Sequence, residues 1–132
     1  MPLYKVYNIH LLKHFQIAVE GNIGSGKSTL LQRIHQKNGS DVCVFSEPVE
    51  RWRNVNGKNL YQMMVENPQR WGFTFQNFVQ LTMAQRHEAI AESAKQRPHL
   101  LHLMERSLLS ARFVFVENLY RKLVQIVFKI AN

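Results

Sequence analysis

Three glycines, a lysine and a serine within eight residues form the clearest chemical signature of this chain. The segment runs from Gly21 to Ser28 and reads Gly-Asn-Ile-Gly-Ser-Gly-Lys-Ser. Glycines at these positions let the backbone turn tightly and point several N–H groups at phosphate oxygens. The amine of Lys27 can then meet the outer phosphates, and the hydroxyl of Ser28 can bind a magnesium ion. The segment therefore predicts a P-loop that binds a nucleoside triphosphate, with ATP and Mg²⁺ as the expected cofactors.

The elements on either side of this loop have the expected types. Residues 15–19 form an apolar run that predicts a buried strand, and residues 27–37 predict a helix whose N-terminus favours anions. A second strand is predicted at residues 42–46, and strand, helix and strand in succession generate a parallel sheet by right-handed crossover. The residues expected to contact the nucleotide are Gly21, Asn22, Ile23, Gly24, Ser25, Gly26, Lys27, Ser28 and Thr29.

Charged residues follow two of the predicted strands. Glu47 comes directly after residues 42–46, and Glu105 and Arg106 follow a third apolar run at residues 100–104. Ligands bind outside the carboxyl ends of the strands in open α/β sheets, so we expect these side chains at the ligand edge. An isolated acid before a proline, or an apolar run ending in Glu-Arg, is more often a solvated strand end.

The middle of the chain predicts helices. Residues 49–59 have no periodicity and are expected to be irregular, whereas residues 60–66 predict a short helix. A long helix should start at Asn67-Pro68, because proline suits the first helical position, and run to about residue 94. A further helix is expected from Ser107 onward.

Composition limits the class of protein. The chain has 132 residues, a 45% hydrophobic content and no apolar run long enough to cross a bilayer, which predicts one globular domain without a membrane partner. Its 17 Lys and Arg against nine acids give a net charge of +8, which suggests a nucleic-acid binder as one hypothesis. The basic residues are scattered and form no recognition module, so nucleic acid is not an expected partner. Residues 1–14 lack a signal-peptide pattern, so the expected location is cytoplasmic, with a mitochondrial location left open.

Four ordered motifs together are similar to one known family. They are Glu-Gly-Asn-Ile-Gly-Ser-Gly-Lys-Ser at 20–28, Glu-Pro-Val-Glu-Arg-Trp-Arg-Asn at 47–54, Arg-Trp-Gly-Phe-Thr-Phe-Gln at 70–76 and Glu-Arg-Ser-Leu-Leu-Ser-Ala-Arg-Phe-Val-Phe at 105–115. This succession resembles the deoxynucleoside kinases. The resemblance implies an α/β, P-loop NTPase-type three-layer fold with a parallel sheet, and transfer of the ATP γ-phosphoryl group to the 5′-hydroxyl of a deoxynucleoside for nucleotide salvage.

The resemblance also implies a role for each site residue. Lys27, Glu47 and Arg106 match the catalytic residues, with Glu47 as general base and Arg106 neutralising the charge of the transferring group. Ser28 and Glu105 match the residues that hold magnesium. Most of the other matches concern the nucleoside, and the substrate-binding set reads Glu47, Trp52, Gln76, Val79, Met83, Arg106, Ala111 and Phe115.

Two of these positions indicate the substrate. Family members that favour deoxycytidine or purines carry Arg and Asp where this chain has Met83 and Ala111. Without these charged groups a thymine methyl has room, and no buried ion is left unpaired. Pyrimidine deoxynucleosides, thymidine or deoxycytidine, are therefore the predicted substrates.

The resemblance also implies a homodimer.

The chain departs from the family in two places. Val65 stands where the family usually has a tyrosine that hydrogen-bonds the sugar, and residues 122–132 resemble no kinase sequence. We expect an extension at 1–14, the N-terminal part of a kinase domain at 15–121 and a divergent tail at 122–132, with the family's C-terminal strands and lid missing. Loss of those strands would expose an apolar edge of the P-loop strand, and the tail could cover this edge or recruit another chain. The alternative function is a catalytically silent, truncated ATP-binding or interaction module of the same family.

Overall fold

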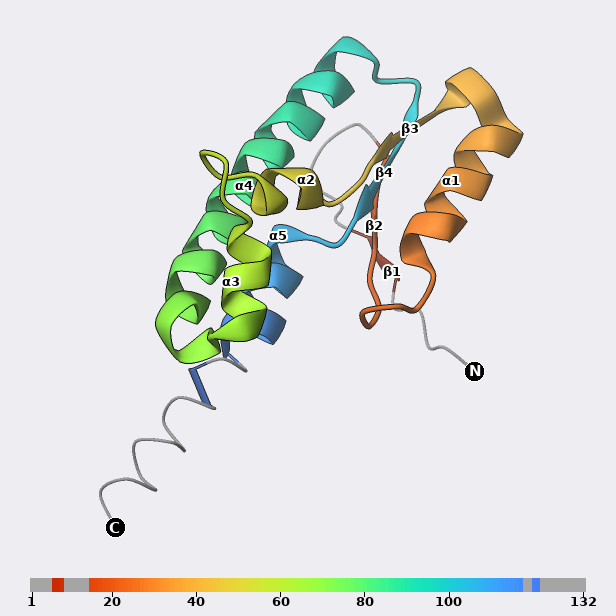
Figure 1. Cartoon of the computed structure of the whole chain (residues 1–132). Coiled ribbons are helices and arrows are strands. Elements are labelled where there is room, and N and C mark those ends of the chain that lie inside the picture. Colours follow the sequence, from red (N-terminus) through yellow and green to blue (C-terminus); the bar gives the residue numbers. More distant parts are fainter. Residues whose placement is uncertain (1–5, 9–14, 118–119, 122–132) are drawn as a thin grey trace. The chain divides into compact units, whose positions relative to one another are not determined.

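The computed structural model describes residues 6–8, 15–117 and 120–121 (Figure 1). These residues divide into two compact units. The first, which we call the sheet unit, contains the described residues up to Glu47 together with 85–107. The second, the helical unit, contains residues 48–84 and the described residues from Leu108 onward. The predicted tail at 122–132 lies outside the described residues.

The sheet unit is built on three parallel strands and one antiparallel strand. The strand order is β1-β2-β4-β3, where β2 is Gln16–Val19, β3 is Val42–Phe45 and β4 is Leu101–Glu105. Strand β4 lies in the middle and pairs in parallel with β2 on one side and with β3 on the other. The carboxyl ends of all three strands therefore lie at one edge, as the sequence predicts.

The outer edge of β2 differs from the prediction. Strand β1, Val6–Asn8, pairs antiparallel with β2 in the register Val6 to Val19 and Asn8 to Ile17. The expectation of an exposed apolar edge beside the P-loop strand is therefore wrong along these residues. The partner strand β1 comes from the segment at 1–14 predicted to be an extension. Its three residues are enough to pair the backbone groups of Ile17 to Val19 in β2.

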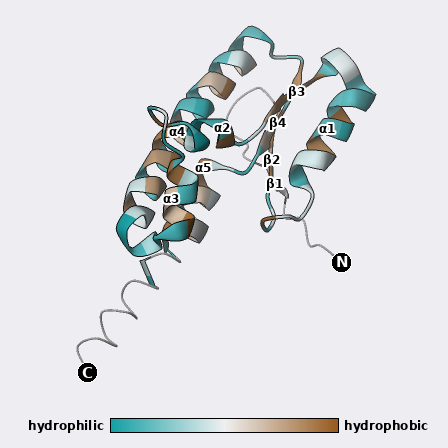
Figure 2. Cartoon of the chain, in the orientation of Figure 1, coloured by the Kyte–Doolittle hydropathy of each residue, from teal (hydrophilic) through white to brown (hydrophobic). Residues whose placement is uncertain are grey.

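Helices cover both faces of this sheet. Helix α1, Lys27–Asn38, buries Leu31 completely against Val19, Val42 and Leu103. The opposite face is covered by the C-terminal part of α4, Pro68–Gln96, where Ile90 packs with Ala18 and Met104. Successive side chains of a strand point to opposite faces of the sheet, so neighbouring strand residues belong to different apolar clusters. In Figure 2 the strands are coloured mainly as hydrophobic. The predicted three-layer α/β fold is confirmed.

The helical unit contains short helices around the N-terminal part of α4. Helix α2 spans Val49–Arg53, α3 spans Leu60–Glu66, and α5, Leu108–Ser110, leads into a π-helix at Ala111–Val116. The expectation of an irregular segment is wrong for residues 49–53, which form α2. Five residues are too few to show a helical period, and Trp52 of α2 is buried by tertiary packing.

Asparagine side chains mark the start of two of these helices. The Oδ1 atom of Asn59 accepts a hydrogen bond from the backbone N–H of Gln62 at 2.9 Å, and Asn67 accepts one from Arg70 at 3.2 Å. Each bond satisfies a donor that the first turn leaves without a backbone acceptor. The predicted start of the long helix at Asn67-Pro68 is confirmed, and α4 extends two residues beyond the predicted end.

A tight turn at Asn56-Gly57 joins α2 to α3. Val55 and Lys58 exchange two backbone hydrogen bonds of 2.8 and 3.0 Å, and φ is 50° at Asn56 and 78° at Gly57. Two successive positive φ angles define a type I′ turn, which favours Asn-Gly. We expect Gly57→Ala to lower the free energy of unfolding by about 1 kcal/mol in urea titrations, because a Cβ is strained at this φ. Asn56→Gly, which removes a strained Cβ, should not destabilise the protein; equal effects of both changes would contradict this account.

Candidate functional site

The P-loop between β2 and α1 is shaped to hold an anion. Gly26 has a φ of 85° and places Lys27 at the start of α1, and the N-terminus of α1 has no side-chain cap. A Cβ on Gly21 would lie 2.8 Å from Oγ of Ser25, so a larger residue cannot fit there without a shift. The uncapped N–H groups of the first turn remain available for phosphate oxygens, which helix N-termini attract.

Lys27 is folded back over this loop. Its side chain is 5% exposed, and its Nζ donates a 2.8 Å hydrogen bond to the carbonyl of Asn22. Burial lowers the pKa of Lys27, the neighbouring Arg106 lowers it further, and Glu105 and Glu47 oppose the shift. A phosphate oxygen in place of the Asn22 carbonyl would give this partly desolvated amine a charged partner.

The two predicted magnesium ligands touch each other. The hydroxyl of Ser28 donates a hydrogen bond of 2.8 Å to Oε1 of the buried Glu105, across 77 residues of sequence. Hydroxyl and carboxylate oxygens are hard ligands, and Mg²⁺ in nucleotide sites combines one or two of them with water and phosphate oxygens. The donor set therefore fits magnesium. Among the described residues no group of three or more His, Cys, Asp or Glu is arranged to hold a metal by itself.

Glu47 and Arg106 form a largely buried ion pair. Nε of Arg106 lies 3.3 Å from Oε1 of Glu47, with side-chain exposures of 6% and 20%. Burial raises the pKa of Glu47, and the charge of Arg106 partly offsets that rise. A carboxylate with a raised pKa and an adjacent cation suits a general base next to a site where negative charge is transferred.

Arg106 has an unusual backbone conformation. Its φ is 58°, in the left-handed region, and its N–H donates to the carbonyl of Val19 at 3.0 Å. The next N–H, of Ser107, donates to Oε1 of Glu20 at 2.8 Å. These bonds join the turn after β4 to the end of β2, so they hold a strained turn beside the P-loop.

Arg86 of α4 belongs to this site, and sequence reasoning missed it. Its guanidinium donates to the carbonyls of Ser46 and Glu105 through Nη1, at 3.0 and 2.7 Å, and to that of Arg106 through Nη2, at 2.6 Å. A weaker contact of 3.4 Å reaches the carbonyl of Phe45. An arginine in a long helix carries no local signal of this role, since its partners are main-chain atoms distant in the sequence.

The helical unit brings together several of the residues predicted to bind the nucleoside. Trp52, Val79, Met83 and Ala111 are all at least 92% buried and belong to one cluster. Nε1 of Trp52 donates a 2.8 Å hydrogen bond to Thr82, which fixes the indole. Three separate segments thus contribute to the cluster, and the role of its residues in binding a nucleoside stays a prediction.

Gln76 lies on α4 one turn before Val79 and Gln80. Its Oε1 atom is buried and has no hydrogen-bond partner among the described residues. A buried acceptor without a partner costs free energy, which a donor on a bound ligand would recover. That Gln76 reads a base edge stays a prediction.

Two other positions of the predicted site give less support. The side chain of Phe115 lies outside the described residues, so its predicted stacking on the base stays a prediction. Val65 is 59% exposed on α3 and presents only methyl groups.

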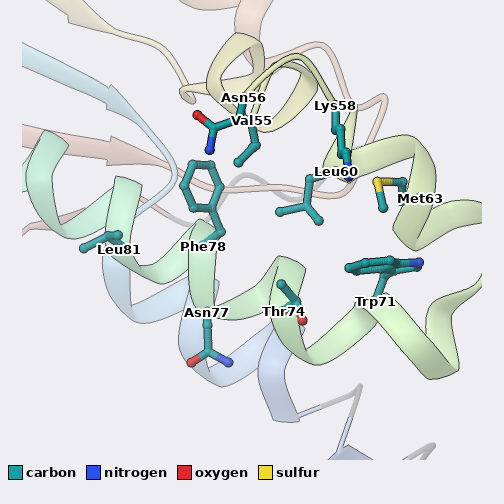
Figure 3. A pocket seen from close by; sticks show the side chains of 10 residues that line it. All are labelled: Val55, Asn56, Lys58, Leu60, Met63, Trp71, Thr74, Asn77, Phe78 and Leu81. Carbon is teal, nitrogen blue, oxygen red and sulfur yellow. The ribbon is translucent and has the colours of Figure 1, made fainter.

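An open groove of about 550 Å³ lies elsewhere on the helical unit (Figure 3). Phe78 and Trp71 project into it from α4, and Leu60 and Met63 from α3 and its start. None of the predicted substrate-binding residues lines it. The volume of this groove is therefore no guide to the residues predicted to be catalytic. We assign the candidate site from the charged and buried polar groups instead.

No helix in the described part of the chain is both long and apolar enough to span a membrane.

Comparison with known proteins gives the family. The family model for deoxynucleoside kinases matches residues 17–125. Mitochondrial thymidine kinase 2 from Macaca fascicularis and from Homo sapiens are each 50% identical over 105 residues, which is 80% of this chain and 37% of the relative. Deoxycytidine kinase 1 from Xenopus laevis is 36% identical over 121 residues, covering 80% of this chain and 45% of the relative. The chain thus spans less than half the length of these relatives.

The residues matched by the family model include the P-loop, the Glu47 turn and the Glu105-Arg106 turn. The fold, the parallel order of β2, β4 and β3, and the uncapped P-loop helix agree with that assignment. The chain belongs to the deoxynucleoside kinase family.

Proposed function

We propose that this chain carries the phosphoryl-transfer site of a deoxynucleoside kinase, with ATP as donor and a pyrimidine deoxynucleoside, thymidine first, as acceptor. The single observation that carries the proposal is the convergence of Lys27, Glu47, Glu105 and Arg106 in the sheet unit, where Glu47 and Arg106 lie 3.3 Å apart. The curated relatives are thymidine and deoxycytidine kinases, which supports the substrate class. Nucleotide salvage is the corresponding role, and the mitochondrial relatives favour a mitochondrial location.

The residues divide the reaction between them. The carboxylate of Glu47 accepts the proton of the 5′-hydroxyl as its oxygen attacks the γ-phosphorus. The bond from phosphorus to the β,γ-bridging oxygen breaks, ADP leaves, and Arg106 and Lys27 neutralise charge on the transferring group. Ser28 and Glu105 would hold Mg²⁺, which neutralises phosphate charge when bound. Gln76 would pair with the base, and Trp52, Val79, Met83, Ala111 and Phe115 would enclose the nucleoside.

The direct test is transfer of labelled γ-phosphate from Mg-ATP to thymidine, deoxycytidine, deoxyadenosine and deoxyguanosine. We expect product with the two pyrimidines and most with thymidine. Purine products in excess would contradict the substrate assignment. A folded chain that binds ATP and transfers no phosphate would contradict kinase activity and support the silent ATP-binding module.

ATP binding is tested separately with Lys27→Met. At an ATP concentration 100-fold above Kd, the wild type should gain about 2.7 kcal/mol of stability, seen as a rise in Tm. The variant should lose this gain because the phosphates lose their amine partner. Without ATP the variant should be at least as stable as the wild type at neutral pH, since burial lowers the pKa of Lys27 and the charged amine therefore opposes folding.

Without ATP, the difference in free energy of unfolding between Lys27→Met and the wild type should become smaller as pH rises through the lowered pKa of Lys27. The reason is that the wild-type amine then loses its charge. The matched control is Lys37→Met in the last turn of the same helix, where the lysine is exposed. It should keep the ATP response in full. An unchanged ATP response in Lys27→Met would remove the P-loop assignment.

Substrate choice is tested at Ala111, which is 2% exposed within the apolar cluster. Ala111→Asp places an unpaired carboxylate there, and we expect thymidine kcat/KM to fall at least tenfold and stability to fall by about 3 kcal/mol. Adding Met83→Arg supplies a cation and should recover part of the stability while moving preference toward deoxycytidine. A single variant with unchanged thymidine kinetics would show that Ala111 does not border the base.

A further inference from the structure

We propose that Arg86 is a positioning residue for phosphoryl transfer, which ties the strand end that carries Glu47 to the strand end that carries Arg106. The inference rests on the proposed function, because it concerns the same site. It adds a residue that none of the four sequence motifs contains. Arg86 and all its partners lie in the sheet unit.

The hydrogen bonds of Arg86 reach both sides of the site. On one side Nη1 donates to the carbonyl of Ser46, the residue immediately before Glu47. On the other side the same nitrogen donates to the carbonyl of Glu105, and Nη2 donates to that of Arg106. One planar side chain therefore fixes the backbone next to Glu47 and the backbone of Arg106, which pairs with Glu47.

The planar shape of the guanidinium matters for this role. Its two terminal nitrogens point in fixed directions and can bind carbonyls on separate strands at once. A lysine ammonium carries the charge on one atom and cannot reproduce that fork. The bonds of 2.6 and 2.7 Å to the turn at Glu105 and Arg106 are the shortest that Arg86 makes. These two bonds hold the carbonyls of Glu105 and Arg106, which lie on either side of the Arg106 Cα, where φ is 58°.

Stability alone is a weak reason for this arrangement. The Nε atom of Arg86 is buried and has no hydrogen-bond partner among the residues that the structure describes. A buried cation with an unpaired donor opposes folding unless other contacts compensate.

Arg86 also acts on the chemistry of Glu47. Its positive charge is one of the groups that lower the pKa of this carboxyl, after Arg106 and Lys27, against the rise caused by burial and by Glu105. Loss of Arg86 should therefore raise the pKa of Glu47 and leave less of the base ionised at neutral pH. An arginine whose charge does not reach Glu47 would leave that pKa unchanged in a variant that stays folded.

The test compares Arg86→Gln, Arg86→Lys and the control Lys95→Gln. Lys95 is a cation on the same helix and in the same unit, and its side chain is 69% exposed. The first measurement is an NMR titration of ¹³C-labelled glutamate carboxyls in the free protein, with Glu47→Gln assigning the Glu47 signal. We expect the Glu47 titration to move to higher pH in Arg86→Gln and not in Lys95→Gln.

The lysine variant keeps the test valid if the glutamine variant does not fold. Arg86→Lys keeps the charge and loses the fork, so the backbone amide signals of Glu47 and Arg106 should both shift. In kinetics, kcat should fall at least tenfold while KM for ATP stays within about threefold, because the P-loop contacts do not involve Arg86. In Arg86→Gln the acidic limb of the kcat profile should also move to higher pH.

The outcomes separate this inference from the proposed function. A wild type without phosphoryl transfer, together with a shifted Glu47 titration in Arg86→Gln, refutes kinase activity and keeps the coupling of Arg86 to Glu47. An active wild type whose folded Arg86 variants have unchanged kcat, unchanged Glu47 titration and unchanged amide signals overturns the inference alone.

Discussion

Replacing Arg106 with glutamine is expected to lower kcat for phosphoryl transfer by about 10³-fold or more, the range found when an arginine that neutralises a transferring phosphoryl group is removed. Arg106 is 5% exposed, so its charge acts in a poorly solvated environment. Its side chain also lies 3.3 Å from Glu47. The glutamine keeps hydrogen-bonding groups but leaves both the transferring group and the base without their cation.

The measurement is steady-state kinetics with saturating ATP and thymidine, compared with Arg33→Gln. Arg33 lies on α1, is exposed and belongs to the same unit, so its loss changes net charge by the same amount. This control should keep kcat within about twofold of the wild type. Since Arg106 lowers the pKa of Glu47, the acidic limb of any residual activity should move to higher pH in Arg106→Gln. A kcat within tenfold of the wild type would show that Arg106 does not contact the transferring group.

The second large effect is expected at Glu47. Glu47→Gln removes the proton acceptor with little change in size, and kcat should fall by about 10²- to 10⁴-fold, the usual contribution of a positioned general base. Wild-type kcat should fall as pH drops through the pKa of Glu47, which burial raises above its ordinary value. The variant should show a low rate without that acidic limb.

Stability gives an independent check on Glu47. Because its pKa is higher in the folded than in the unfolded state, the folded protein binds this proton more tightly, and the corresponding stability is lost as pH rises through the folded pKa. Glu47→Gln should therefore gain stability relative to the wild type as pH rises over that interval. The matched control is Glu50→Gln, since Glu50 is 87% exposed and pairs with the neighbouring Arg53. A pH-independent stability difference in Glu47→Gln would contradict the raised pKa.

The sequence predicts those parts of the molecule that depend on local patterns. The P-loop glycines, the apolar strands and the Asn67-Pro68 helix start are each determined by nearby residues, and the structure contains all three. Register and strand order are not local, yet the parallel crossover restricts them to few arrangements. This is why Glu47 and Arg106, 59 residues apart in sequence, could be placed at one sheet edge beforehand.

Three features escaped prediction for different physical reasons. Strand β1 pairs through its backbone, and three residues carry too little side-chain pattern to announce a strand. Helix α2 is equally short and depends on the burial of Trp52 in a cluster assembled from distant segments. Arg86 binds main-chain carbonyls, which every residue has, so its partners leave no trace in the sequence. The Asn56-Gly57 turn is different, because its signal was present and its type I′ geometry follows from the dipeptide.

The left-handed backbone of Arg106 sets stability and activity against each other at a single position. A non-glycine residue at such a φ costs about 1 to 3 kcal/mol, and a glycine would escape that cost while losing the guanidinium. Selection of random variants for thermal tolerance alone should therefore enrich glycine or asparagine at 106 and yield proteins that bind nucleotide and transfer phosphate about 10³-fold or more slowly. Selection for turnover should restore arginine in spite of the strain. The residue found at position 106 therefore depends on whether stability or turnover was under selection.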